Sequence, residues 1–124
     1  MQEFQDMFSD LFDLEEQLDK YEWIIEYGAV ARPVFSVKKL DDNLVTGCTS
    51  NLWLEKIDGN FYCYGESLIV QGIASMICDW YNQASETQQL NFSLNTLNNI
   101  GLAPLLSMGR QNGVASLISK MKTL

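Results

Sequence analysis

Histidine is absent from the sequence and basic side chains are few. The 8 lysines and arginines stand against 16 acidic residues, so the net charge is −8 at neutral pH. Without histidine, the chain can form neither a histidine general base nor a zinc site with a histidine ligand. The surplus of negative charge repels phosphate groups and argues against nucleic-acid binding. A length of 124 residues supports one modest core, so we expect a single domain over residues 1–124 rather than a two-domain enzyme.

Long hydrophobic runs are also missing. The longest apolar stretch, Leu68 to Trp80, is interrupted by polar residues and is too short to span a bilayer. Residues 1–10 include carboxylates, which argues against a secretory signal or a transit peptide. These features predict a cytoplasmic protein with no membrane partner.

Cysteine is scarce, and the sequence has no Cys-x-x-Cys pair. Cys48, Cys63 and Cys78 are an odd number in a chain without an export signal, which indicates free thiols. With no histidine to complete a ligand set, we expect no metal site.

Charge is unevenly distributed along the chain. Residues 1–30 carry nine acidic side chains and one lysine, whereas residues 87–124 carry only three charges, all of them basic. We favour the interpretation that an acidic N-terminal helix lies near a basic C-terminal one. The alternative is that the two ends form separate charged docking surfaces.

The N-terminal region has the spacing of an amphipathic helix. Apolar residues recur at helical intervals, beginning with Phe4, Met7, Phe8 and Leu11. Asp13 and Glu16 have the spacing of a capping box, which predicts two helical pieces meeting near residues 9–13. Gly28 and Pro33 are expected to end the second piece.

The middle of the chain has strand periodicity. Asp58-Gly59 is a strong two-residue hairpin signal between two apolar, aromatic-rich runs, and it places Leu54 opposite Cys63. The residues predicted to share the core face of the sheet are Leu52, Leu54, Phe61 and Cys63. A further short strand through Leu44 and Val45 would bring the sheet to about three strands.

The remaining sequence is helical in pattern. Residues 67–81 are apolar almost all round and predict a central core helix. Ser85 and Ser93 are candidate N-caps of two short helices. The last helix should bury an apolar stripe formed by Val114, Leu117, Ile118 and Met121. The order of elements predicts an α+β fold, in which helices cover one face of a small antiparallel sheet.

Cys48 is the cysteine best placed for chemistry. Cys63 and Cys78 fall on predicted core faces, where free cysteine usually behaves as a small hydrophobe. Cys48 lies in a Gly-Cys-Thr-Ser turn between strand segments, and such a turn can present its sulfur to solvent.

The segment NLVTGCTSNLW, from Asn43 to Trp53, resembles the cysteine signature of the SufE family of sulfur-acceptor proteins. Three further blocks follow the family pattern in order along the chain. They are Tyr21-x-x-Ile24-Ile25-x-x-Gly28, Ile69-Val70-Gln71-Gly72 and Arg110-Gln111-Asn112-Gly113.

This resemblance implies a fold shared with SufE and similar to IscU-type scaffold proteins. It also implies a relay, in which a pyridoxal-phosphate cysteine desulfurase of the SufS or CsdA type donates persulfide sulfur to Cys48. The loaded protein would then pass that sulfur to a SufBCD-like iron–sulfur cluster scaffold. Such a sulfurtransferase-like carrier needs no cofactor of its own, and the sequence leaves open whether it forms a homodimer.

A thiol attacks as its thiolate, so a nearby cation would assist the transfer. Arg110 is the candidate, because the resemblance retains it and it precedes the last helix, whose N-terminus favours negative charge. Its alternative role is as a surface arginine that pairs with the acidic N-terminal region. We expect the Cys48 turn to rest against apolar side chains and to swing outward in a complex.

Two other functions compete with that of a sulfur carrier. The protein could bind and stimulate a desulfurase without carrying sulfur, in which case Cys48 would be dispensable. A metal-cluster scaffold is disfavoured, because the chain has neither histidine nor paired cysteines.

Overall fold

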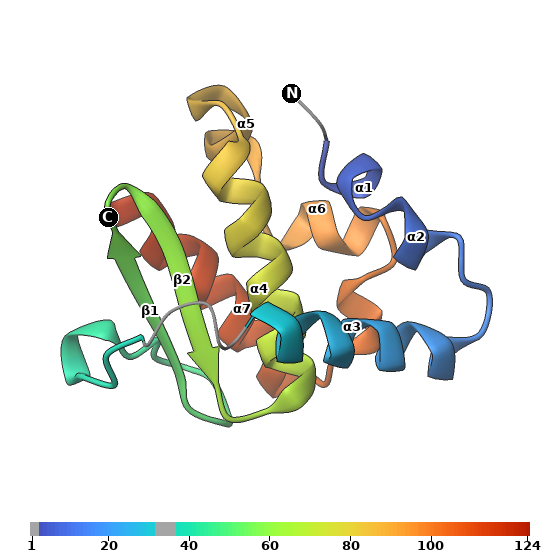
Figure 1. Cartoon of the computed structure of the whole chain (residues 1–124), viewed down its shortest axis with the longest axis horizontal. Helices are drawn as coiled ribbons and strands as arrows, with labels where there is room; N and C mark the ends of the chain where they lie inside the picture. The colour runs from blue at the N-terminus through green and yellow to red at the C-terminus, as the bar shows by residue number, and fades with distance from the viewer. Residues whose placement is uncertain (1–2, 32–36) are drawn as a thin grey trace.

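The computed structural model describes residues 3–31 and 37–124, and it is mostly helical with one antiparallel hairpin (Figure 1). In chain order the elements are α1 (Phe4–Met7), α2 (Ser9–Phe12), α3 (Gln17–Ala31), the 3-10 turn η2 (Asp41–Asn43), β1 (Leu52–Ile57), β2 (Asn60–Gly65), α4 (Leu68–Gln83), α5 (Glu86–Asn91), α6 (Leu94–Asn99), the 3-10 turn η3 (Ala103–Leu105) and α7 (Met108–Thr123). The predicted mixture of helix and antiparallel sheet is confirmed.

The hairpin forms in the predicted register. Asp58 and Gly59 both adopt positive φ, at 52° and 85°, which fits a tight two-residue turn between twisted strands. Leu54 pairs with Cys63 across the strands. The four side chains predicted to face the core are all buried, namely Leu52, Leu54, Phe61 and Cys63.

The prediction of about three strands is wrong for the described residues, where the sheet has two. Leu44 forms only an isolated bridge with Trp53, and the Val45 N–H donates to the Leu52 carbonyl at 2.7 Å. The turn η2 ends at Asn43 and another turn begins at Thr46, so only two residues are free to pair.

Side chains of α4 satisfy the outer edge of β2, where a further strand would otherwise pair. The Asn82 amide accepts from the Phe61 N–H at 2.7 Å and donates to the Phe61 carbonyl at 3.0 Å. Gln71, which is buried, accepts from the Gly65 N–H and donates to the Cys63 carbonyl. These bonds protect an exposed strand edge and tie the hairpin to the central helix.

The helix α4 is the centre of the core, as predicted. The Ser67 hydroxyl caps it by accepting from the Val70 N–H, and residues 69–78 are buried throughout. Gly28 lies within α3 against Gly72 of α4, where a Cβ would come within 2.6 Å of the Gly72 nitrogen. The prediction that Gly28 helps to end its helix is therefore wrong, because α3 continues to Ala31 and this glycine allows two helix backbones to approach closely. Pro33, the other predicted stop, lies outside the described residues.

The N-terminal region forms three helices, α1 to α3, rather than the two predicted pieces, and it breaks at Phe8 and again at residues 13–16. Asp13 is the C-cap of α2 rather than an N-cap, and α3 begins at Gln17. The predicted N-caps Ser85 and Ser93 are confirmed, each with a capping box. The predicted stripe on the last helix is buried in α7, through Val114, Leu117, Ile118 and Met121.

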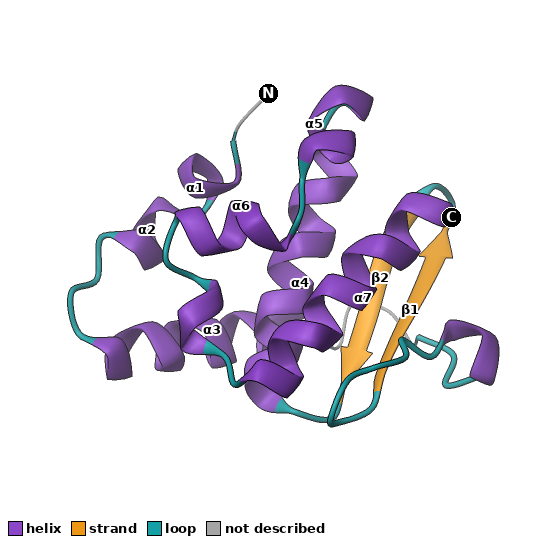
Figure 2. Cartoon of the chain, turned by 180° about the vertical axis from the view of Figure 1, so that it is seen from behind, coloured by secondary structure: helices purple, strands orange, loops and turns teal. Residues whose placement is uncertain are grey.

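One face of the hairpin is covered by helix. The hairpin lies in front of α7 in Figure 1 and behind it in Figure 2, which views the molecule from the opposite side. Among the described helices, none is both long enough and apolar enough to cross a membrane.

Candidate functional site around Cys48

Cys48 lies in the loop formed by residues 46–51, which we call the Cys48 loop. Backbone bonds close the base of this loop on both sides. Val45 donates to Leu52, and the Glu66 N–H donates to the Asn51 carbonyl at 3.0 Å. The loop therefore extends from a fixed base at the end of the molecule where α4 and α7 begin (Figure 1).

The tip of the Cys48 loop rests on two glycines of α7. A Cβ built on Gly113 would overlap Cys48 Sγ and lie only 2.7 Å from Cys48 Cβ. A Cβ built on Gly109 would overlap the Thr49 methyl group. We call Gly109 and Gly113 the glycine surface of α7. It brings the loop closer to the helix than any other residue type would allow.

Two further contacts extend this arrangement along the helix. Gly47 has a φ of 81°, and a Cβ built on it would lie 3.2 Å from the Ser116 hydroxyl. Lys120 donates to the carbonyls of Asp42 at 2.7 Å and Leu44 at 3.4 Å. Successive residues before and within the loop thus meet successive turns of α7 in antiparallel order.

Cys48 is more exposed to solvent than the other two cysteines. Cys63 is 9% exposed and Cys78 is 2% exposed, whereas Cys48 is half-buried and packs against the edge of the hydrophobic core. The expected contact with apolar side chains is thus present, although the closest support is the glycine surface. Ser50 holds a buried hydroxyl that has no hydrogen-bond partner among the described residues.

Arg110 lies in the first turn of α7, between the two glycines. Its backbone N–H donates to the Ser107 hydroxyl that caps the helix, at 3.4 Å. The side chain is half-buried, and its guanidinium forms no hydrogen bond or ion pair within residues 3–31 and 37–124. The structure thus brings Arg110 to the helical turn under the loop but shows no hydrogen bond between Arg110 and Cys48.

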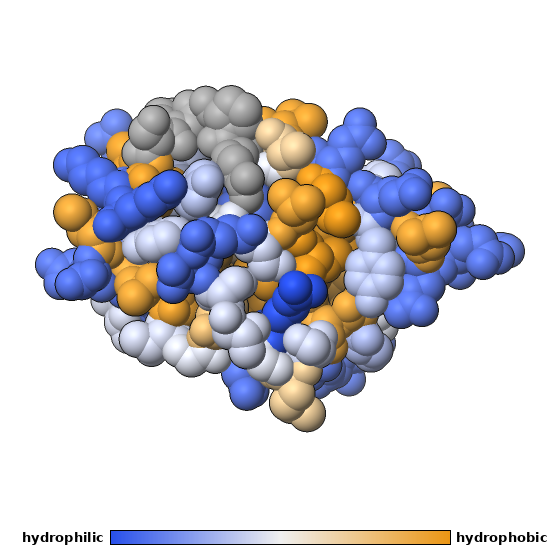
Figure 3. All heavy atoms as spheres, turned by 90° about the horizontal axis from the view of Figure 1, so that it is seen from below, coloured by the Kyte–Doolittle hydropathy of each residue, from blue (hydrophilic) through white to orange (hydrophobic). Residues whose placement is uncertain are grey.

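Two exposed apolar residues begin α4 and α7, within two residues of Glu66 and Gly109, which contact the Cys48 loop. Leu68, the first residue of α4, is 56% exposed, and Met108, the first residue of α7, is 71% exposed. Figure 3 views the molecule from below and shows apolar side chains gathered across this face among hydrophilic ones. Apolar surface beside a presented side chain is typical of a protein-docking site.

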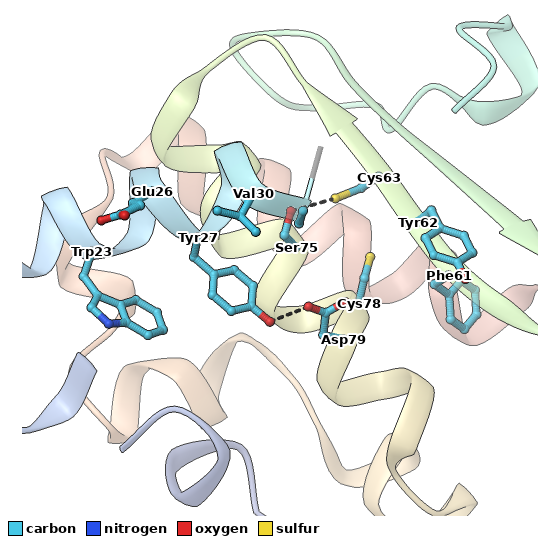
Figure 4. A pocket seen from close by; sticks show the side chains of 11 residues that line it. Trp23, Glu26, Tyr27, Val30, Phe61, Tyr62, Cys63, Ser75, Cys78 and Asp79 are labelled. Carbon is cyan, nitrogen blue, oxygen red and sulfur yellow. Dashed lines mark hydrogen bonds between the residues drawn. The ribbon is translucent and has the colours of Figure 1, made fainter. Parts of the chain in front are cut away.

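A cavity that does not include Cys48 lies between α3, β2 and α4. It has a volume of about 550 Å³ and contains Cys63 and Cys78 rather than Cys48 (Figure 4). The hydrogen bond to Cys63, together with burial, raises the pKa of Cys78, which keeps this thiol protonated and unreactive.

The same cavity holds a tyrosine–carboxyl pair. The Tyr27 hydroxyl donates to the Asp79 carboxylate (Figure 4). Burial raises the pKa of Asp79, and the bond from Tyr27 opposes that shift. The pKa of Tyr27 is also raised, first by burial and then by Asp79.

Among the described residues, the candidate reactive group is one partly exposed thiol, that of Cys48. They contain no group of three or more histidine, cysteine, aspartate or glutamate residues that could hold a metal ion. One accessible thiol, with a cationic residue in the helical turn under its loop, is suited to thiol–disulfide or persulfide exchange, which needs only an attacking and a leaving thiolate.

Comparison with known proteins agrees with this geometry. Residues 5–124 match the SufE family, described as a Fe–S metabolism associated domain. The chain belongs to the SufE family. It is 30% identical over 127 residues to an uncharacterized SufE-like protein of Rhizobium meliloti, covering 94% of this chain and 90% of the relative. It is 27% identical to an uncharacterized SufE-like protein of Rhizobium etli, covering 94% and 84%.

Sequence reasoning singles out Cys48 as the candidate residue of this SufE-family chain, but it does not predict the helix surface on which the Cys48 loop rests. Gly109, Gly113 and Ser116 follow one another at intervals of four and three residues, which places them on one face of a helix. Small residues at that spacing are a signal that another backbone approaches closely. Only the structure identifies that backbone as the Cys48 loop.

Proposed function

We propose that this protein is a sulfur acceptor that carries persulfide sulfur on Cys48. The Cys48 thiolate attacks the outer sulfur of a persulfide on a donor cysteine. A new S–S bond forms at Cys48, the donor's S–S bond breaks, and the donor cysteine leaves as a thiolate. The step exchanges one S–S bond for another, so it needs no external oxidant or reductant.

The observation that carries this proposal is the contrast between the three thiols. Cys48 is half-buried in a loop, whereas Cys63 and Cys78 are buried in the core. Membership in the SufE family supports the same assignment. A carrier must present its sulfur to two successive partners, and of the three thiols only Cys48 lies near enough to the surface to do so.

Arg110 is the residue proposed to stabilise the charged sulfur. It directly follows Gly109, which contacts Thr49, and its guanidinium has no competing carboxylate among the described residues. It can approach a thiolate or persulfide anion if the loop shifts, and the N-terminus of α7 adds a favourable dipole.

The donor is a pyridoxal-phosphate cysteine desulfurase, and the receiver is an iron–sulfur cluster scaffold. In this proposal the protein acts in the cytoplasm as one domain, residues 1–124. Leu68 and Met108 provide apolar contact area for a protein partner around the thiol.

Intact-mass analysis after incubation with a desulfurase and cysteine tests the proposal. We expect the mass of one sulfur atom to be added and to map to the peptide that contains Cys48. Cys48→Ser should abolish the addition, whereas Cys63→Ser and Cys78→Ser should retain it. Stimulation of the desulfurase by Cys48→Ser, together with an unmodified wild-type protein, would instead identify a non-catalytic stimulating module.

A further inference from the structure

Asp79 is the one residue of α4 between Ile69 and Tyr81 that is not buried, because it lines the cavity between α3, β2 and α4 (Figure 4). Its carboxylate accepts a hydrogen bond from the Tyr27 hydroxyl. It forms no ion pair within residues 3–31 and 37–124. A carboxylate has about four lone-pair sites on its two oxygens, so Asp79 can accept further hydrogen bonds from a ligand.

The walls of this cavity are largely aromatic. On α3, Trp23 and Tyr27 are stacked, with ring centroids 5.4 Å apart and an angle of 17° between the ring planes. Phe61 and Tyr62 line the cavity from β2 (Figure 4). Aromatic faces pack well against flat apolar groups, and their negative electrostatic potential attracts cations.

The size and charge of the cavity restrict what it can bind. Its volume of about 550 Å³ lies within the range of about 300–1,000 Å³ that is typical of small-molecule sites. The described lining includes two carboxylates, Asp79 and the exposed Glu26, but no lysine or arginine. Burial raises the pKa of Asp79, because the charged form is poorly solvated there. A cation in the cavity would offset that cost, whereas an anion would be repelled.

We propose that the cavity between α3, β2 and α4 binds a small aromatic amine, whose ammonium group pairs with Asp79 and whose ring packs against the aromatic walls. A lysine side chain of a partner protein carries the same charge, but its stem has no flat face to match these walls. The site is separate from the sulfur chemistry, because Cys48 does not line the cavity.

Three indole compounds that differ in charge test the proposal by isothermal titration calorimetry of the full chain at neutral pH. Tryptamine, a cation, should bind about tenfold or more tightly than the neutral alcohol tryptophol, because it adds a charge-assisted bond to Asp79. Indoleacetate, an anion, should bind most weakly. A lysine amide acetylated on its α-amino group has the ammonium without the ring, and it should bind more weakly than tryptamine.

Asp79→Asn assigns the charge effect to one residue. It should weaken tryptamine binding by about tenfold and leave tryptophol binding unchanged, because only tryptamine uses the carboxylate charge. Glu26→Gln should have a smaller effect, since water screens an exposed carboxylate. Glu86→Gln removes the same charge from α5, outside the cavity, and is the matched control. Cys48→Ser should bind tryptamine as wild type does.

Backbone amide NMR shifts locate the ligand. Tryptamine should shift the signals of Tyr27, Cys63 and Asp79, which line the cavity, and leave the Cys48 loop unchanged. Four results would overturn the proposal: no saturable binding of tryptamine, equal affinities for tryptamine and tryptophol, equal losses in Asp79→Asn and Glu86→Gln, or shifts confined to other surfaces. Binding of the lysine amide as tight as that of tryptamine would instead assign the cavity to a partner's side chain.

Discussion

Arg110 is an unusual residue for its position, because it is a half-buried cation with no partner among the described residues. Structural arginines at such sites usually pair with carboxylates, and this chain has many carboxylates available. A guanidinium without a partner among the described residues, carried by the helical turn under the Cys48 loop, is available to interact with the anionic sulfur of a persulfide. Its contribution should therefore appear in sulfur transfer rather than in folding.

Arg110→Ala should slow sulfur transfer to Cys48 by about tenfold or more, since it removes a positive charge from the site of the developing anion. The free energy of unfolding should change by less than about 0.5 kcal/mol, because no side-chain bond is lost. Single-turnover transfer and urea denaturation measure the two effects. Arg110→Lys keeps the charge and should retain part of the rate, so equal rates in all three proteins would contradict this role.

The shifted pKa of Asp79, which lines the cavity between α3, β2 and α4, predicts how stability depends on pH. Its pKa is raised above the ordinary 3.8, so the native state binds the proton more tightly than the unfolded state does. Above the raised pKa both states are ionised, and the native state bears the cost of the buried charge. Asp79→Asn should therefore be more stable than wild type at pH 7, while its amide oxygen can still accept from Tyr27.

The stability difference between Asp79→Asn and wild type should shrink as the pH falls through the raised pKa towards 3.8. Below that range the wild-type carboxyl is protonated in both states and the charge penalty disappears. Urea unfolding at a series of pH values measures the difference. A gap that widens with acidification would show that Asp79 is stabilised as a carboxylate, through Tyr27.

At the scale of helices and strands, the sequence predicts those features that depend on residues close together in the chain. The hairpin register follows from Asp58-Gly59, and the short helices follow from Ser85 and Ser93, because turns and caps are local interactions. The prediction of a third strand through Leu44 and Val45 is wrong, since turns on both sides of these two residues leave only an isolated bridge from Leu44 to β1.

The candidate site likewise has one part that the sequence predicts and one part that it does not. Cys48 can be identified from its turn and from the family signature around it. Its support by Gly113 cannot, because glycine in a helix carries no local signal of what approaches it. The prediction that Gly28 ends its helix is wrong for the same reason, since Gly28 packs against Gly72 of another helix.

Two glycine-to-alanine substitutions should separate packing from backbone strain. A Cβ on Gly72 would come within 2.7 Å of the Ile24 carbonyl carbon, so Gly72→Ala should force α3 and α4 apart at a cost of about 1–3 kcal/mol or more. A Cβ on Gly59 would meet no atom within 4 Å, but this residue has a φ of 85°, so Gly59→Ala should cost only about 1 kcal/mol of strain.

Urea denaturation measures both values. An equal cost at the two positions would contradict the close contact between α3 and α4. Leu68→Ala, which changes an exposed residue in the first turn of α4, is the control for substitution in that helix and should be close to neutral.

At the scale of the whole molecule, the acidic N-terminal region and the basic C-terminal helix do not neutralise each other. Lys120 and Lys122 donate to backbone carbonyls, of Asp42 and Leu90. In the part of the chain that the structure describes, no carboxylate of α1–α3 forms an ion pair. The preferred interpretation of the charge pattern, an acidic helix paired with a basic one, therefore has no ion pair to support it.

The unpaired acidic residues should make the free protein more stable in salt. Asp19, Glu22 and Glu26 are exposed on α3 at spacings of three and four residues, where like charges repel one another. Raising NaCl to ~0.3 M shortens the screening length and weakens that repulsion, so the midpoint of urea unfolding should rise. Glu22→Gln removes the middle charge and should both stabilise the protein at low salt and reduce its response to salt.

Glu86 provides a control, because removing its charge should change stability in the opposite direction from Glu22→Gln. It lies in the first turn of α5, where a carboxylate interacts favourably with the helix dipole. Glu86→Gln should therefore destabilise the protein slightly at low salt. If the acidic face binds a positively charged partner, the same salt that stabilises the free chain must weaken the complex. If the midpoint of urea unfolding fell as salt was added, the carboxylates of α1–α3 would be stabilised by attraction rather than destabilised by repulsion. If the affinity for a positively charged partner did not depend on salt, these carboxylates would not belong to the docking surface.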